Sequence, residues 1–119
     1  MDTIQWIIIL LFVVFIVSRF MPVKGVTNIS VQEAKDKFKD NPVQFVDVRT
    51  PGEYKANHRK PFKNIPLSTL GSKAGELDKE KDVVVICQSG MRSVKAAKML
   101  KKQGFQKIYN VKGGMSAWS

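Results

Sequence analysis

The chain has only one cysteine and one histidine among its 119 residues. A single cysteine excludes an internal disulfide framework, so the protein is not a disulfide-stapled miniprotein. The length suits one domain and argues against a multidomain enzyme. Acidic residues are also scarce, with 10 Asp and Glu against 20 Lys and Arg, and none follows Asp82. The apolar share of 44% is nevertheless too high for a disordered basic tail.

Charged side chains are missing from residues 1–23 except for Asp2 and Arg19. The segment is otherwise almost entirely apolar, and residues 4–23 would span about 30 Å as a helix. No Lys or Arg precedes the run and no small-residue cleavage site follows it, which disfavours a cleaved signal peptide. A buried core helix is the other alternative. We expect residues 1–23 to form a transmembrane anchor in contact with membrane lipid.

The charges that flank this segment predict its orientation. Arg19 and Lys24 lie at its C-terminal side, and a basic domain follows them. Because positive charge favours the inner side of a membrane, we expect a single-pass protein of the cell membrane with its domain in the cytoplasm. A short linker is expected at 24–28 and a folded domain over 29–119.

The remainder alternates extended and helical patterns. Strands are expected at 26–29, 43–48, 64–67, 83–87 and 107–111. Helices are expected at 30–38, 68–81, 93–103 and 115–118, with a polar loop over 50–62. Ser30 and Glu33 have the spacing of a capping box. The unbroken β-branched run at 83–87 indicates burial on both faces. This order predicts an α/β fold with a central, mostly parallel sheet covered by helices on both faces.

Cys87 ends the best predicted strand and precedes the best predicted helix. Ligands of open α/β sheets bind at that edge. Gly90 lets backbone amides turn toward a bound anion, and the positive end of the helix adds to this cradle. With Arg92 nearby, these surroundings favour the thiolate, which is the nucleophilic form. The alternative is a small buried residue that only ends a strand.

Several short motifs now form an ordered set. They are Asp47-Val-Arg49, Pro51-Gly-Glu-Tyr54, Asn64-Ile-Pro-Leu67, Cys87 to Ser93, and Gly113-Gly-Met-Ser-Ala-Trp118. Together they resemble the single-domain rhodaneses, which are sulfurtransferases, over residues 27–119. The resemblance implies a rhodanese-like three-layer fold.

The resemblance also implies a ping-pong reaction through a persulfide on Cys87. The donor would be a small sulfur-containing anion such as thiosulfate, or a protein persulfide, and the acceptor a thiol. The implied anion-binding loop consists of Gln88, Ser89, Gly90, Met91 and Arg92. The implied supporting residues are Asp47, Arg49 and Ser93, with Arg92 also able to anchor the loop to the sheet. We expect no metal site and no cofactor.

Two details bear on the chemistry. The loop from Cys87 to Arg92 has six residues, whereas phosphatases of this fold use seven, so the length favours sulfur transfer. The segment at 57–63 departs from the usual family pattern, and His58 within it is more simply structural than catalytic. A non-catalytic binding or redox-sensing module is the alternative function.

The basic residues of the C-terminal third have two interpretations. Lys95, Lys98 and Lys102 recur on one side of the predicted helix over 93–103, which is typical of a solvated face. Beside a membrane, the same charge could contact anionic lipid. We expect no nucleic-acid partner, because the sequence has neither a base-stacking array nor a known binding motif.

Overall fold

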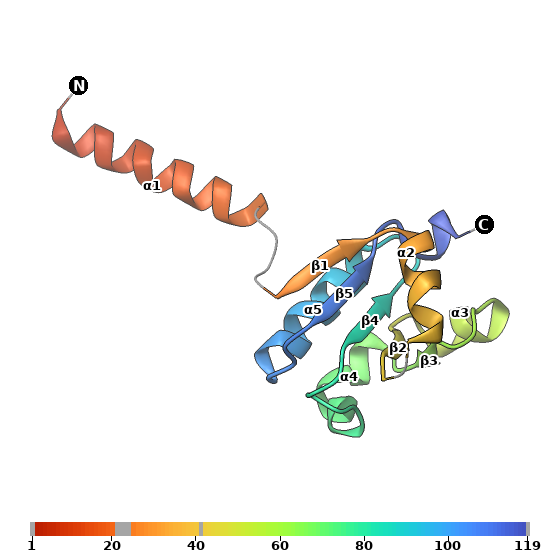
Figure 1. Cartoon of the computed structure of the whole chain (residues 1–119). Coiled ribbons are helices and arrows are strands. Elements are labelled where there is room, and N and C mark those ends of the chain that lie inside the picture. Colours follow the sequence, from red (N-terminus) through yellow and green to blue (C-terminus); the bar gives the residue numbers. More distant parts are fainter. Residues whose placement is uncertain (1, 21–24, 41, 119) are drawn as a thin grey trace.

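The computed structural model describes residues 2–20, 25–40 and 42–118. Its centre is a five-stranded sheet in the order β1-β5-β4-β2-β3, and every neighbouring pair is parallel (Figure 1). The strands are β1 Val26–Ile29, β2 Gln44–Asp47, β3 Lys63–Asn64, β4 Val83–Ile86 and β5 Ile108–Val111. The parallel sheet expected from the sequence is confirmed.

Helices connect the strands. They are α2 Val31–Asp36, α3 Pro51–Ala56, α4 Leu67–Lys73 and α5 Met91–Lys102, whereas α1 Thr3–Phe20 precedes the first strand. Short 3-10 helices are η1 Lys37–Lys39, η2 Ala74–Glu76 and η3 Gly114–Ala117. The buried residues form two clusters, one with α4 and α5 and the other with α2 and η3. Helices therefore cover both faces of the sheet, as the α/β prediction requires.

Strand β4 lies at the centre of both clusters. All four of its residues are fully buried. Val83 and Val85 pack toward α4 and α5, whereas Val84 and Ile86 pack into the opposite cluster. Alternate side chains of a strand point to opposite faces, so an apolar residue is required at each position. Cys87 continues this alternation and joins the cluster beneath α4 and α5.

The expected polar loop over 50–62 is wrong in its first half, because α3 occupies Pro51–Ala56. Thr50 caps this helix and Glu53 returns the bond, which makes a second capping box besides that of Ser30 and Glu33. Pro51 at the first helical position needs no amide partner there. The spacing of Thr50 and Glu53 indicates the start of this helix, whereas the polar composition of the segment favours a loop.

Other boundaries are shorter than expected. The strand expected over 64–67 is only Lys63–Asn64, because Pro66 has no amide for the ladder and instead stands at the start of α4. The helix expected over 68–81 ends with η2 at Glu76.

The N-terminal segment forms α1, which is 18 residues long and ends at Phe20. Its large apolar side chains between Ile4 and Val17 are exposed. Within residues 2–20, 25–40 and 42–118, no helix has the length and apolar character needed to cross a membrane. The transmembrane helix expected over 1–23 is thus not found, and the end of that span, 21–23, lies outside the described residues.

Candidate active site

Cys87 is the first residue after β4, and the turn that follows leads directly into α5. Gly90 precedes the first residue of this helix and has a φ of 99°, a left-handed conformation that favours glycine. The turn therefore brings the N-terminal end of α5, which carries partial positive charge, back toward the cysteine. The Cys87 side chain is fully buried.

Two groups contact the sulfur of Cys87. The amide of Gly90 donates to Sγ over 2.9 Å, and the thiol donates to the hydroxyl of Ser93 over 3.3 Å. A backbone amide and a helix N-terminus both stabilise negative charge on sulfur. The arrangement can therefore hold a thiolate, or the terminal sulfur of a persulfide, at the base of the loop.

Ser93 connects the sulfur to a buried polar network. Its hydroxyl is hydrogen-bonded to Asn110 Oδ1 and to the carbonyl of Gly90, and Asn110 in turn donates to Asn28 Oδ1 over 3.0 Å. Ser93 and Asn110 are at most 3% exposed, so each needs these partners. The sequence indicated Ser93 but not Asn110, which lies on β5 and is 17 residues away.

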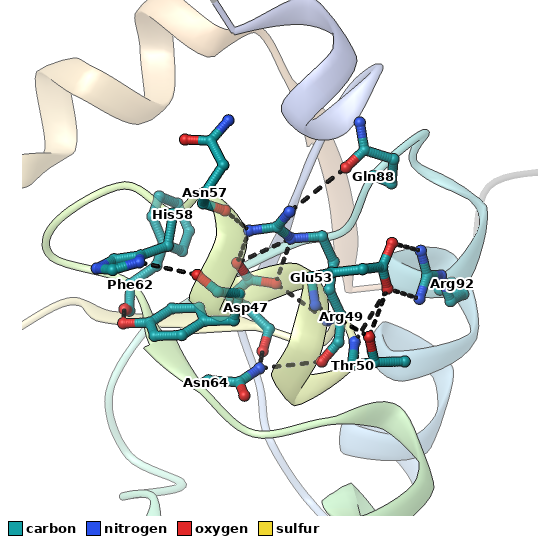
Figure 2. A network of polar contacts seen from close by, with 11 residues as sticks. Asp47, Arg49, Thr50, Glu53, Asn57, His58, Phe62, Asn64, Gln88 and Arg92 are labelled. Carbon is teal, nitrogen blue, oxygen red and sulfur yellow. Dashed lines mark hydrogen bonds and ion pairs between the residues drawn. The ribbon is translucent and has the colours of Figure 1, made fainter.

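Arg92 forms the outer wall of the loop. Its guanidinium donates to both carboxylate oxygens of Glu53, over 2.6 and 2.9 Å (Figure 2). The expectation that Arg92 anchors the loop to the sheet needs correction, because its partner lies on α3. Such a bidentate pair fixes the direction of a guanidinium as well as its charge. Glu53 is a contributor to the site that the sequence did not indicate, since the two residues are 39 positions apart.

The pair changes the proton affinity of both partners. Hydrogen bonding from Arg92 is the main cause that lowers the pKa of Glu53 from 4.5 to about 2. Hydrogen bonding to Glu53 raises the pKa of Arg92, and the negative charges of Glu53, Cys87 and Asp47 add to the effect. Both groups therefore remain charged throughout the neutral range.

Replacing Glu53 with glutamine should destabilise the protein near neutral pH, because it removes the charge that Arg92 binds. The folded-state pKa of Glu53 is depressed, so its contribution to the free energy of unfolding is complete above 4.5 and is lost as the pH falls through about 2. The stability difference between the two proteins should shrink over that interval. Urea unfolding at a series of pH values measures it, with the exposed Glu80→Gln as control. A difference independent of pH would contradict the assignment.

Asp47 and Arg49 form a buried ion pair at the end of β2 (Figure 2). The guanidinium of Arg49 contacts both oxygens of Asp47 and reaches the Gln88 side chain over 3.4 Å. Asn64 donates to the carbonyls of Asp47 and Arg49, each over 3.0 Å. The pair thus connects β2 to Gln88, the first residue of the active-site loop, and its supporting role stays a prediction.

The C-terminal segment lies directly against this loop. The amide of Met115 donates to the carbonyl of Cys87 over 2.8 Å, and that of Ser116 donates to the carbonyl of Gln88 over 2.9 Å. Gly114 has a φ of 56°, and a Cβ there would lie 2.1 Å from the carbonyl oxygen of Cys87. Before folding is considered, the motif at 113–118 has no predicted role beyond the resemblance. Its glycine permits the close approach that holds the loop in place.

The other expected site residues lie on the surface. Gln88 and Ser89 are exposed, and Met91 is 80% exposed at the start of α5. His58 stacks on the ring of Tyr54 at 4.2 Å, and its Nδ1 lies 2.9 Å from the carbonyl of the same residue. These contacts suit the structural interpretation of His58.

The chain resembles several known proteins in sequence. The sequence pattern of the rhodanese-like domain matches residues 30–119. A putative sulfur carrier protein of Bacillus subtilis, YrkF, is 38% identical over 96 residues, which make up 80% of this chain and 52% of that protein. A sulfurtransferase of Allochromatium vinosum is 35% identical over 77 residues, or 65% of this chain and 72% of that protein.

Similarity extends to solved structures. The crystal structure of a rhodanese-like domain protein from Staphylococcus aureus superposes with a TM-score of 0.72 at 34% identity. The match covers 78% of this chain and 91% of that one. Some curated relatives are longer: this chain spans 60% of the uncharacterized Bacillus subtilis protein YqhL, with 43% identity over 75 residues.

Proposed function

This chain belongs to the rhodanese-like domain family, and from that premise we propose that it is a sulfurtransferase that carries sulfane sulfur on Cys87. The donor is a small sulfur-containing anion such as thiosulfate, and the acceptor is a thiol. The observation that carries the proposal is the position of the sulfur, 2.9 Å from the Gly90 amide and at the N-terminal end of α5. That position favours a charged sulfur in an otherwise buried place.

The first half-reaction uses Cys87 as a nucleophile. Its thiolate attacks the outer sulfur of thiosulfate, a new S–S bond forms, and the bond to the sulfite sulfur breaks. Sulfite leaves with the electron pair of that bond, so no further oxidant is needed. The persulfide left on Cys87 carries its negative charge on the terminal sulfur, within the turn made by the loop.

In the second half-reaction the acceptor thiolate attacks this terminal sulfur. The electron pair of the broken S–S bond returns to Cys87 as a thiolate, and the acceptor leaves as a persulfide. Arg92 lies at the edge of the loop and keeps its positive charge through Glu53. The excess of Lys and Arg over Asp and Glu, 20 against 10 in the chain, favours the approach of anionic donors and acceptors.

The size of the loop supports sulfur rather than phosphate as cargo. Only four residues separate Cys87 from Arg92, one fewer than in the phosphatases of this fold. In addition, the C-terminal segment fixes the carbonyls of Cys87 and Gln88, which restrains the loop from opening wider. A smaller loop suits a single sulfur atom better than a tetrahedral phosphate.

A paired assay tests the proposed activity. The wild-type protein should release thiocyanate from thiosulfate and cyanide, and should release no phosphate from aryl phosphates above the background rate. Phosphate release without thiocyanate formation would replace the proposal with phosphatase chemistry. Absence of both activities, with no sulfur adduct on the protein, would favour a binding or redox-sensing module instead.

We also propose that α1 attaches the protein to the cell membrane with the rhodanese-like domain on the cytoplasmic side. Support comes from its apolar side chains between Ile4 and Val17, which are 40–68% exposed. Exposed apolar surface of this extent is costly in water and is stabilised by lipid. Arg19 is in the last turn of the helix and Lys24 follows it in sequence, and positive charge at this end favours a cytoplasmic domain.

Liposome flotation tests this attachment. The full chain should float with the vesicles, and replacing Leu10 and Leu11 with aspartate should return most of it to the soluble fraction, because charge within an apolar helix opposes lipid contact. Lys79→Asp, an exposed change far from α1 in sequence, is the control and should float like the wild type. Failure of the unmodified chain to float would end the proposal.

A further inference from the structure

A cavity of about 470 Å³ lies between α4 and α5, at the edge of the sheet where Cys87 stands. We call it the α4–α5 groove. Val48, Leu67 and Met99 line it together with Arg92 and Lys95. Its volume is within the range of small-molecule sites, about 300 to 1,000 Å³. Apart from Arg92, the residues that line it have no role in the two half-reactions.

The groove reaches the neighbourhood of the reacting sulfur. Val48 follows β2, where Asp47 pairs with Ile86, so Val48 and Cys87 are neighbours across the two strands. The amide of Val48 donates to the carbonyl of Ile86 over 2.9 Å. Val48 and Cys87 also pack in the same buried cluster beneath α4 and α5. The floor of the groove therefore adjoins the cysteine, and Arg92 stands where the groove meets the active-site loop.

The groove has apolar walls and a cationic rim. Arg92, Lys95 and Met99 are spaced by three and four residues, so they lie on one face of α5. Glu53 neutralises Arg92, but across residues 2–20, 25–40 and 42–118 no carboxylate pairs with Lys95. Among the residues that the structure describes, no acidic side chain lines the groove. Charge complementarity therefore selects an occupant with a short apolar body and a negative group.

We propose that the α4–α5 groove binds the acceptor, a low-molecular-weight thiol that carries a carboxylate. The inference rests on the proposed sulfurtransferase function and names the substrate class of its second half-reaction. The carboxylate contacts Lys95, the hydrocarbon part packs on Leu67 and Met99, and the thiolate faces the terminal sulfur on Cys87. Attack then forms the S–S bond of the acceptor persulfide and returns the electron pair to Cys87.

The test separates the two half-reactions. Full-length protein is loaded with excess thiosulfate until intact mass shows one added sulfur per chain, and the donor is then removed. Discharge is followed with 3-mercaptopropionate, which is anionic, and with 3-mercapto-1-propanol, its neutral analogue. The rate ratio of variant to wild type is taken separately for each thiol, so that their intrinsic reactivities cancel.

Lys95→Gln should slow discharge by 3-mercaptopropionate about threefold, and Lys95→Glu about tenfold, as expected for an exposed charge contact. Discharge by 3-mercapto-1-propanol should change less than about twofold. Lys98→Glu is the matched control, since Lys98 is exposed on the same helix but does not line the groove. Added salt should reduce the effect of Lys95→Glu.

Each negative outcome has a distinct meaning. If no sulfur adduct forms on the wild-type protein, the proposed function itself fails. If the adduct forms but Lys95→Glu slows both thiols equally, or acts no more strongly than Lys98→Glu, the sulfurtransferase stands and the acceptor site is overturned.

Discussion

Cys87→Ser should abolish sulfur uptake from thiosulfate, with thiocyanate formation falling to the uncatalysed rate. The hydroxyl of serine is a far weaker nucleophile than a thiolate near neutral pH and forms no persulfide. Because Cys87 is the only cysteine in the sequence, a sulfur atom detected by intact mass spectrometry can be assigned to this residue. The wild type should gain the mass of one sulfur atom, and the variant should gain nothing.

This substitution is also a mild structural change. Serine is close to cysteine in size, and the Gly90 amide and the Ser93 hydroxyl can hydrogen-bond to its oxygen. Thermal unfolding should therefore shift only slightly, which separates lost chemistry from lost folding. A sulfur adduct on the Cys87→Ser protein would show that the persulfide is not carried on the proposed residue.

Gly114→Ala should give the largest loss of stability. A Cβ at this position would lie 2.1 Å from the carbonyl oxygen of Cys87 and 2.9 Å from its carbonyl carbon, and both are backbone atoms. The residue also has a φ of 56°, where an L side chain costs about 1–2 kcal/mol. With overpacking added, the free energy of unfolding should fall by about 3 kcal/mol. Sulfur transfer should fall with it, because the displaced carbonyls belong to the active-site loop.

Gly75→Ala is the matched control for this variant. Nothing lies within 4 Å of a Cβ at Gly75, and its φ is not left-handed. Its free energy of unfolding should change by less than about 0.5 kcal/mol, as for most surface substitutions. Urea unfolding and thiocyanate formation measured on both variants give the comparison. Equal stability of the two alanine variants would contradict the close packing of the C-terminal segment on the loop.

Local patterns identified much of the fold because they depend on neighbours along the chain. The apolar run at 83–87 indicated a buried strand, and the spacing of Ser30 and Glu33 indicated a helix start; both are confirmed. The helix after Thr50 carries the same kind of signal, but proline, glycine and charged residues dominate its composition and favour the prediction of a loop. The strand expected over 64–67 ends at Asn64, because Pro66 has no amide with which to pair with the neighbouring strand.

Two features of the site follow directly from neighbouring residues in the chain: the cysteine lies between a strand and a helix, and the loop from Cys87 to Arg92 has six residues. The groups that hold this loop are known only from the folded chain. Glu53 binds Arg92, Asn110 binds Ser93, and the segment at 114–116 binds the carbonyls of Cys87 and Gln88. These partners are distant in sequence and meet only because the parallel strands end at one edge of the sheet.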